Sequence, residues 1–321
     1  MPSYSGVWTL PAVMQAIGSQ NWPSVTITTG LFGGGTLTGR NVIEKITIET
    51  TGNATDFGDF TISSGYLGAC SSSTRGVWAG GIASGIINSI QYVTFATLGN
   101  STAFGDLTIT TYGVTGCSNS TRGLFAGGYG GTPNDLQNVI GYITIASTGN
   151  ATDFGDMTTV SWGAGSCASS TRGIFAGGSP TGSASSGTNI IGYVTIASTG
   201  NATDFGDLIN APAFPVGCSS NTTGIFGSGR DTDRTNVIQY ITIASTGNAT
   251  DFGDLNAALT YSSACSSSTR GVFAGGQNSA IADVSTIQYV TISTTGNATT
   301  FGNLTVANSG LAGCSSGHGG I

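Results

Sequence analysis

A block of about fifty residues recurs along the chain, and this periodicity constrains the fold more than any other feature of the sequence. The block closes on the motif TGNATDFGD or a near variant of it. Copies begin at Thr51, Leu98, Thr148, Thr199, Thr246 and Thr295, so successive copies lie 47, 50, 51, 47 and 49 residues apart. Units of this size cannot bury an apolar face alone, so we expect them to pack against one another in one regular array.

Each repeat contains short runs in which apolar and polar residues alternate, such as residues 193–196, Tyr-Val-Thr-Ile. Alternation with a period of two is typical of β-strands. Four such runs per repeat predict an all-β chain, and the period near fifty favours a β-propeller. We therefore expect one β-propeller domain over residues 24–321, preceded by a leader, residues 1–23, that lacks the repeat.

The order of motifs within a repeat resembles that of kelch-type propellers. A strand with a cysteine is followed by a strand ending in a double glycine, a loop, a third strand, and a fourth strand with an aromatic residue. The kelch aromatic, usually Trp, is matched here by Phe57, Phe104, Phe154, Phe205, Phe252 and Phe301. The resemblance implies blades of four antiparallel strands, and it implies no single function.

A strand count predicts how the ring of blades closes. The repeats begin with a second strand, at residues 30–35, and end just after a first strand containing Cys314. The C-terminal strand should therefore be the innermost strand of the blade that the N-terminal repeat begins. Residues 24–27 align loosely with the cysteine strand and are the competing candidate for that position. This arrangement gives a six-bladed, kelch-like β-propeller without unpaired strand edges.

Cysteine occurs once per repeat, always in the expected innermost strand. The six are Cys70, Cys117, Cys167, Cys218, Cys265 and Cys314. Equivalent positions in different blades should not meet, so we expect buried free thiols rather than disulfides. Zinc requires clustered Cys and His ligands, and the chain has one histidine, His318.

The charge pattern argues against several classes of partner. Charged residues make up 7% of the chain, and eight basic residues leave a net charge of −7, which disfavours nucleic-acid binding. No apolar run is long enough to span a bilayer. The N-terminus has neither a basic region nor a long apolar core, so we expect neither a signal peptide nor membrane insertion.

The two faces of the predicted disc differ in variability. One, the turn face, carries the SSTRG and TGN turns and is nearly the same in every repeat. The other, the loop face, carries the loops between second and third strands, which differ in length and sequence. Recognition commonly uses variable loops on a rigid scaffold.

On the loop face, five aromatic residues four or five positions before a cysteine should surround the channel mouth: Tyr66, Tyr112, Trp162, Phe214 and Tyr261. They form the candidate ligand-binding site for a sugar ring or a protein patch, and the alternative is that they only fill the space between inner strands.

The leader supplies a second resemblance. Its run SGVWTLPAVMQAIGSQNWP resembles the leaders of virion and tail-associated proteins of marine and freshwater bacteriophages. This implies a virion location, other virion proteins as partners, and attachment through Trp8 and Trp22. We therefore expect a non-enzymatic structural or recognition protein of a phage particle that binds a host-surface glycan or protein. A bacterial kelch-type interaction module is the alternative.

No catalytic constellation stands out, so a glycan-active enzyme is the weaker alternative, and we expect no cofactor and no metal site. The acidic residues of TDFGD could suit calcium, but their recurrence in a turn favours local hydrogen bonding.

The turn arginines suggest one further hypothesis, in which each pairs with an aspartate of the following blade: Arg75 with Asp153, Arg122 with Asp204, Arg172 with Asp251 and Arg270 with Asp56.

Overall fold

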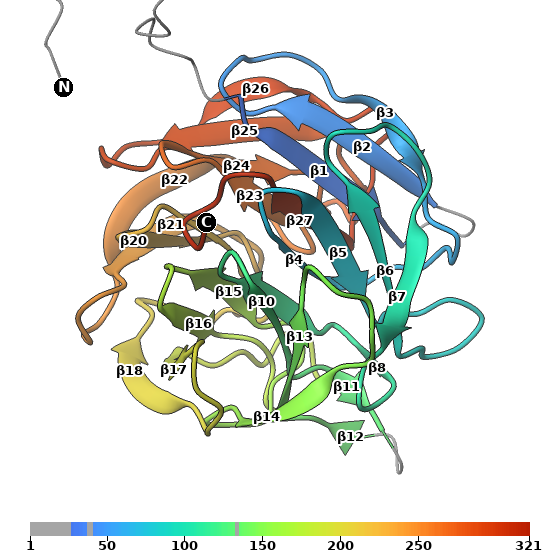
Figure 1. The fold of residues 1–321 in the computed structure, drawn as a ribbon. Helices are drawn as coiled ribbons and strands as arrows, with labels where there is room; N and C mark the ends of the chain where they lie inside the picture. The colour runs from blue at the N-terminus through green and yellow to red at the C-terminus, as the bar shows by residue number, and fades with distance from the viewer. Residues whose placement is uncertain (1–26, 37–40, 132–134) are drawn as a thin grey trace, which may run out of the picture.

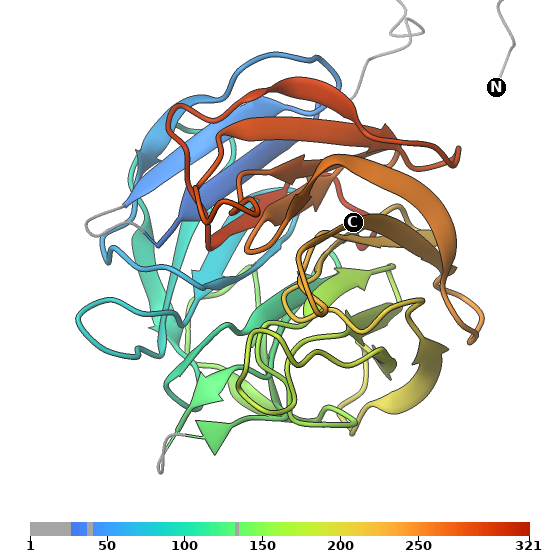
Figure 2. The ribbon, with the colours of Figure 1, turned by 180° about the vertical axis from the view of Figure 1, so that it is seen from behind.

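The computed structural model describes residues 27–36, 41–131 and 135–321. Within these residues the secondary structure consists of 27 β-strands without a helix. Six antiparallel sheets of four strands and one small sheet of three surround a common centre (Figure 1), and the opposite view shows the same arrangement from behind (Figure 2). The prediction of an all-β chain built from four-stranded antiparallel units is confirmed, and the architecture is β-propeller-like.

The strands of each sheet run from the centre outward in a fixed order. The innermost strands contain the cysteines and are β4 (Gly68–Ser71), β9 (Thr115–Ser118), β15 (Gly165–Ala168), β19 (Val216–Ser219), β23 (Ser263–Ser266) and β27 (Leu311–Ser315). The second strands are β1 (Thr29–Gly34), β5 (Arg75–Ala79), β10 (Arg122–Ala126), β16 (Arg172–Ala176), β20 (Thr223–Gly227) and β24 (Arg270–Ala274).

Two further layers complete the sheets. The third strands are β2 (Val42–Thr47), β6 (Ser89–Thr94), β13 (Val139–Thr144), β17 (Ile190–Thr195), β21 (Thr235–Thr242) and β25 (Thr286–Thr291). The outermost strands are β3 (Thr55–Asp59), β7 (Thr102–Asp106), β14 (Thr152–Asp156), β18 (Thr203–Asp207), β22 (Thr250–Leu259) and β26 (Thr299–Asn303). The small sheet contains β8 (Thr111–Tyr112), β11 (Tyr129–Gly130) and β12 (Asp135–Leu136).

The first sheet combines strands from both ends of the described chain. β27 pairs antiparallel with β1, so that Leu31 lies opposite Cys314. The innermost strands contact their neighbours in the order β27, β4, β9, β15, β19, β23 and again β27. The strand count of the sequence predicts this pairing of the C-terminal strand with the N-terminal sheet.

A β-bulge explains the recurring FGD motif. Between the third and fourth strands the register shifts at Phe57, because Ile43 lies opposite Gly58 and Glu44 lies opposite Asp56. The same shift occurs in the other five sheets. A bulge of this kind redirects a side chain, and Phe57 is 2% exposed within the core.

The six cysteines are free and buried, as predicted. Each sulfur lies against a glycine in the second strand of the following sheet: Cys70 against Gly123, for example, where an added Cβ would lie 2.5 Å from the sulfur. Burial raises the pKa of the Cys117 thiol to about 12 and raises the others in the same direction. The thiols therefore act as small apolar groups that pack one sheet onto the next.

The hypothesis of arginine–aspartate pairs is wrong. The Arg75 guanidinium lies over the ring of Tyr92 in its own sheet, 4.6 Å from the centroid, and Nη1 donates to Ile145 O of the following sheet at 3.0 Å. Arg122, Arg172 and Arg270 make equivalent contacts. The aspartates proposed as partners are exposed on the outermost strands. The arginines thus do link each sheet to the following one, but through a backbone carbonyl.

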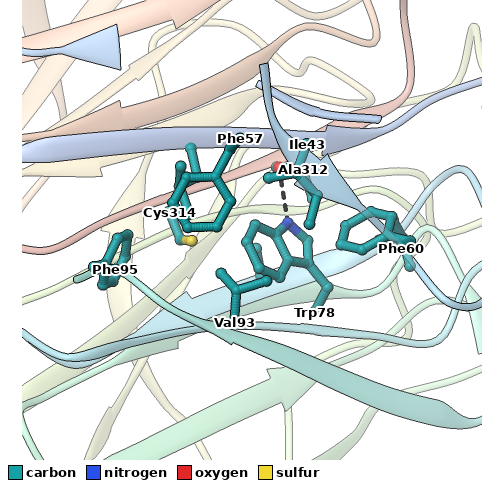
Figure 3. Packing of buried hydrophobic residues seen from close by; sticks show 11 residues of the cluster. Ile43, Phe57, Phe60, Trp78, Val93, Phe95, Ala312 and Cys314 are labelled. Carbon is teal, nitrogen blue, oxygen red and sulfur yellow. Dashed lines mark hydrogen bonds between the residues drawn. The ribbon is translucent and has the colours of Figure 1, made fainter. Parts of the chain in front are cut away.

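One interface between sheets contains a tryptophan in place of the phenylalanine found at the equivalent position of the other second strands. Trp78 is fully buried, and its Nε1 donates to Ala312 O of β27 at 3.0 Å (Figure 3). Phe60 packs edge-on against the indole at 5.1 Å. Trp78 therefore joins β5 to the C-terminal strand of the first sheet by both packing and a hydrogen bond.

Candidate functional site

The five predicted aromatic residues do come together, around the loop-face mouth of the central channel. Their rings contact one another in a complete circuit, with centroid separations of 6.2 Å for Tyr66–Tyr112, 5.6 Å for Tyr112–Trp162, 4.6 Å for Trp162–Phe214, 4.6 Å for Phe214–Tyr261 and 5.5 Å for Tyr261–Tyr66. The contacts are edge-to-face or tilted, which are the favoured geometries for aromatic pairs. Five rings complete the circuit because the sixth repeat contributes Gly310, which has no side chain. We call these five residues the aromatic mouth.

The backbone beneath the aromatic mouth adopts a left-handed conformation at one position in every repeat. This position is held by Tyr66, Gly113, Gly163, Phe214, Tyr261 and Gly310, with φ between 55° and 68°. Amides there donate to the equivalent carbonyl of the neighbouring repeat, as from Gly113 N to Tyr66 O at 2.8 Å. In three repeats an aromatic residue thus adopts a backbone conformation that favours glycine.

Glycine at this position also makes room for the neighbouring ring. An added Cβ on Gly113 would lie 2.3 Å from the indole of Trp162, and one on Gly163 would lie 2.1 Å from the ring of Phe214. In those two repeats the aromatic residue stands one position earlier, at Tyr112 and Trp162. The circuit therefore mixes two backbone positions, a detail that the sequence spacing of four or five residues already indicates.

Several polar groups of the aromatic mouth have no hydrogen-bond partner among the described residues. Within the described chain, the hydroxyls of Tyr66, Tyr112 and Tyr261 make no hydrogen bond, and Trp162 Nε1 is buried without a partner. Burial raises the pKa of Tyr66 to about 12, and the nearby Tyr261, Asp283 and Tyr112 act in the same direction. Burial also raises the pKa of Tyr112 and of Tyr261. All three phenols therefore stay neutral at physiological pH and can donate hydrogen bonds.

A second set of residues surrounds the aromatic mouth, and sequence reasoning missed it. In five repeats the segment before the innermost strand pairs with one residue of the variable loop, through an isolated bridge or the small sheet of β8, β11 and β12. These loop residues, which we call the rim, are Ile82, Tyr129, Ser179, Arg230 and Gln277. Tyr129 extends the aromatic surface, with its ring 5.7 Å from that of Tyr112. The variable loops thus give each of these five repeats a different chemistry beside the mouth.

The channel beneath the aromatic mouth is narrow. Its cavity measures about 120 Å³ and is lined by the innermost strands. Pockets that enclose drug-sized ligands usually measure roughly 300–1,000 Å³. The space inside the channel suits a few water molecules, so any larger ligand must contact the outer surface of the loop face.

The opposite mouth, on the turn face, is closed by hydrogen bonds. In five of the six innermost strands a serine donates from Oγ to the equivalent carbonyl of the preceding sheet, as from Ser118 to Ser71 O at 2.7 Å. Ser71, Ser219, Ser266 and Ser315 make the same contact. Ala168 interrupts the series, because it has no hydroxyl. We call this arrangement the serine mouth.

Residues 316–321 lie across the serine mouth, near the centre that the sheets surround (Figure 1). Gly319 N donates to Ser219 O at 3.0 Å, and Gly320 packs so closely that an added Cβ would lie 1.8 Å from Ser118 O. That carbonyl is the one that a serine at position 168 would otherwise reach. Sequence reasoning missed this segment, although the change from CSS to CAS and the closing GHGG were the available signals.

The histidine of this segment is neutral. Its Nε2 lies 3.2 Å from Ser71 O and donates to it, while Nδ1 accepts a hydrogen bond from Gly320 N at 2.9 Å. Burial lowers the pKa of His318 from its usual 6.5 to about 4, and the hydrogen bond to Ser71 acts in the opposite direction. A proton on Nδ1 would face the Gly320 amide, so the charged form opposes this docked arrangement.

Three further features of the sequence analysis concern attachment, metal binding and membrane insertion. Trp8 and Trp22, the candidate attachment residues, lie in the leader, which is outside the described residues. Within residues 27–36, 41–131 and 135–321, no three His, Cys, Asp or Glu side chains are grouped as metal ligands. The same part of the chain contains no helix with the length and hydrophobicity of a membrane span.

The TGN turns have a role that the sequence did not suggest. The Asn100 side chain accepts a hydrogen bond from Asp59 N of the preceding sheet at 3.0 Å, and the other five repeats make the same contact. These asparagines therefore link adjacent outermost strands.

Comparison with known proteins adds no relative. No protein-family model matches the chain, and no curated protein matches it significantly.

Proposed function

We propose that the protein is a non-enzymatic structural and recognition component of a bacteriophage particle, built as a closed, six-bladed, kelch-like propeller. The leader would attach it to other virion proteins, and the loop face would bind a saccharide or protein on the host surface. The resemblance of the leader to the leaders of phage virion and tail proteins supports a location in a phage particle. The cyclic contacts of the innermost strands and the pairing of β27 with β1 support the closed ring.

The observation that carries the recognition role is the left-handed conformation of Tyr66, Phe214 and Tyr261. A non-glycine residue in this region costs about 1–2 kcal/mol, and glycine holds the equivalent position in three other repeats. A simple plug could keep glycine there and take its aromatic residue from the preceding position, as Tyr112 and Trp162 do. Backbone strain of this kind concentrates at binding sites. Unpaired phenol hydroxyls beside aromatic rings are also the groups that stack on and hydrogen-bond to sugars.

Binding on an outer surface also fits the narrow channel, which leaves no enclosed cleft at the aromatic mouth for a polymeric substrate. We expect purified protein to bind host cells or a glycan array. Trp162→Ala should lose that signal while the fold, measured by circular dichroism, persists. Equal binding by a variant that lacks all five aromatic residues of the mouth would refute the recognition role.

The location in a particle has its own test. Mass spectrometry of virions purified from a host that carries the gene should detect the protein at a constant ratio to capsid or tail proteins. Genes for capsid or tail proteins beside its own would support the same conclusion. Its exclusive presence in the soluble host fraction would favour the bacterial interaction module instead.

A further inference from the structure

Two arginines lie opposite each other in the loop between β20 and β21, and one of them, Arg230, belongs to the rim. Arg230 and Arg234 form an antiparallel bridge, and residues paired in this way place their Cβ atoms about 4.5–5.5 Å apart on the same face. Like charges directly opposite are destabilising. The chain has only eight basic residues, and two of them occupy paired backbone positions beside the aromatic mouth.

Neither guanidinium is neutralised by an acidic side chain within the described residues. Arg234 donates from Nε to Gln277 O at 3.1 Å and from Nη2 to Gln277 Oε1 at 2.7 Å, which leaves Nη1 without a partner. Arg230 Nε is buried and unpaired. The Asp233 carboxylate is turned to the loop backbone, because its Oδ1 accepts from Arg234 N at 2.7 Å. The backbone of the same loop is held by a hydrogen bond from Asp231 N to Asp233 O.

Both arginines are anchored next to the aromatic mouth. Arg230 exchanges backbone hydrogen bonds of 2.7 and 2.8 Å with Ala213, the residue before Phe214. Gln277, which holds Arg234, pairs in the same way with Thr260, the residue before Tyr261. Burial raises the pKa of Tyr261, and the charges of Arg230 and Arg234 oppose that shift, so both charges act on this phenol.

We propose that Arg230 and Arg234 bind the carboxylate of an acidic sugar, a uronic or sialic acid, whose ring lies on Tyr261. This rests on the proposed function, because it names the ligand class of the same mouth. A planar carboxylate matches the donor fork of a guanidinium, and an anion between the two arginines would relieve their repulsion. The neutral phenol of Tyr261 supplies a further donor for a sugar hydroxyl. Asp231 and Asp233 set a negative charge nearby, so the site should select a small carboxylate over a highly charged polyanion.

The test compares glycans that bear uronic or sialic acid with the same glycans after reduction of the carboxyl group to an alcohol. We expect the wild-type protein to bind the acidic members at least tenfold more tightly, as measured by titration calorimetry on the best array hits. The preference should weaken as ionic strength rises, since part of it is electrostatic. The double variant Arg230→Gln with Arg234→Gln should lose the preference and keep binding of the reduced glycans.

Two controls isolate the site. Lys45→Gln removes one positive charge from β2 and should change nothing. Arg230→Lys with Arg234→Lys keeps both charges but loses the planar forks, and should reduce the preference by a smaller factor; it also replaces the glutamine variant if that variant fails to fold.

The outcomes separate this inference from the proposed function. Glycan binding that depends on Trp162 but ignores the carboxyl group would overturn the carboxylate site and leave the recognition role intact. A preference for acidic glycans that survives in the folded double variant would overturn it equally. Absence of binding to every glycan would overturn the carboxylate site, and absence of binding to host cells as well would overturn the recognition role.

Discussion

The two mouths of the central channel are closed by different means, although the same innermost strands build both. At the aromatic mouth, side chains of five repeats meet over a backbone held in the left-handed region. At the serine mouth, short side chains and the backbone of residues 316–321 close the channel through hydrogen bonds. The aromatic mouth leaves phenol and indole groups unpaired, whereas the hydrogen bonds at the serine mouth join protein groups to one another. This difference supports the proposal that the aromatic mouth, rather than the serine mouth, is the binding surface.

The largest expected effect is on the aromatic mouth. Trp162 packs against Tyr112 and Phe214, so Trp162→Ala should lower the free energy of unfolding by about 2–4 kcal/mol, somewhat less than for a fully buried tryptophan. Chemical denaturation measures this value. Trp162→Phe keeps an aromatic ring and should lose less than half as much. Equal losses for the two variants would mean that the ring contacts contribute little.

At the serine mouth, Gly320→Ala should displace residues 316–321, because the new Cβ would overlap Ser118 O. We expect stability to fall by about 1–3 kcal/mol and the Gly319 amide to lose protection from hydrogen exchange. Gly52→Ala is the matched control, since nothing lies within 4 Å of its added Cβ, and it should stay within about 0.5 kcal/mol of wild type. Unchanged protection in the Gly320 variant would contradict this docking of the segment.

Acid should loosen the serine mouth and spare the aromatic mouth. The pKa of His318 is lowered to about 4 in the folded state. Below pH 6.5 the unfolded chain therefore binds a proton on this imidazole, whereas the folded chain does not. The contribution of the segment is therefore complete above about pH 6.5 and falls as the pH decreases toward 4. The loss should be roughly 1–3 kcal/mol, limited by the free energy of docking of the segment. His318→Gln should remove this part of the pH dependence. Parallel stability curves for the two proteins between pH 4 and 6.5 would argue against a buried neutral imidazole.

The smallest expected effect concerns the backbone strain at the aromatic mouth. Strain predicts that glycine is more stable than alanine at one position and less stable at another. Tyr66 has a φ of 57°, so Tyr66→Gly should be more stable than Tyr66→Ala by about 1 kcal/mol. Tyr112 is a strand residue outside the left-handed region, so there the order should reverse, with alanine more stable by roughly 0.5–1 kcal/mol. Thermal unfolding of the four variants decides the matter. The same order at both positions would remove the argument from strain.

Much of the aromatic mouth could be predicted from the sequence. Its five residues stand four or five positions before the cysteines, and a position that recurs in the repeats recurs at a similar radius and depth when the repeats pack around a common centre. The serine mouth could be predicted only in part. Residues 316–321 follow the last strand, and although CAS and the closing GHGG mark a departure from the repeat, neither specifies contacts with Ser71, Ser118 and Ser219.

The turn arginines show where such prediction stops. Their recurrence correctly indicated a contact with the following sheet, but matching charges suggested aspartates, and the partners are carbonyl groups such as Ile145 O. Every residue has a carbonyl, so a hydrogen bond to one leaves no trace in the pattern of side chains. The pairing of Arg230 with Arg234 was hidden for a different reason, because it depends on the path of a loop that occurs once.

The sequence by itself determined the all-β class, the order of four strands in each repeat, the buried free cysteines and the residues that line one mouth. These follow from alternation along a strand and from periodicity, which are local properties repeated many times. Only the tertiary structure decided which groups meet between sheets: cysteine with glycine, asparagine with the preceding outermost strand, the final segment with the serine mouth, and arginine with arginine on the rim. These contacts join residues that are distant in sequence or that lie on loops without a repeat, and they depend on how the sheets are placed in space.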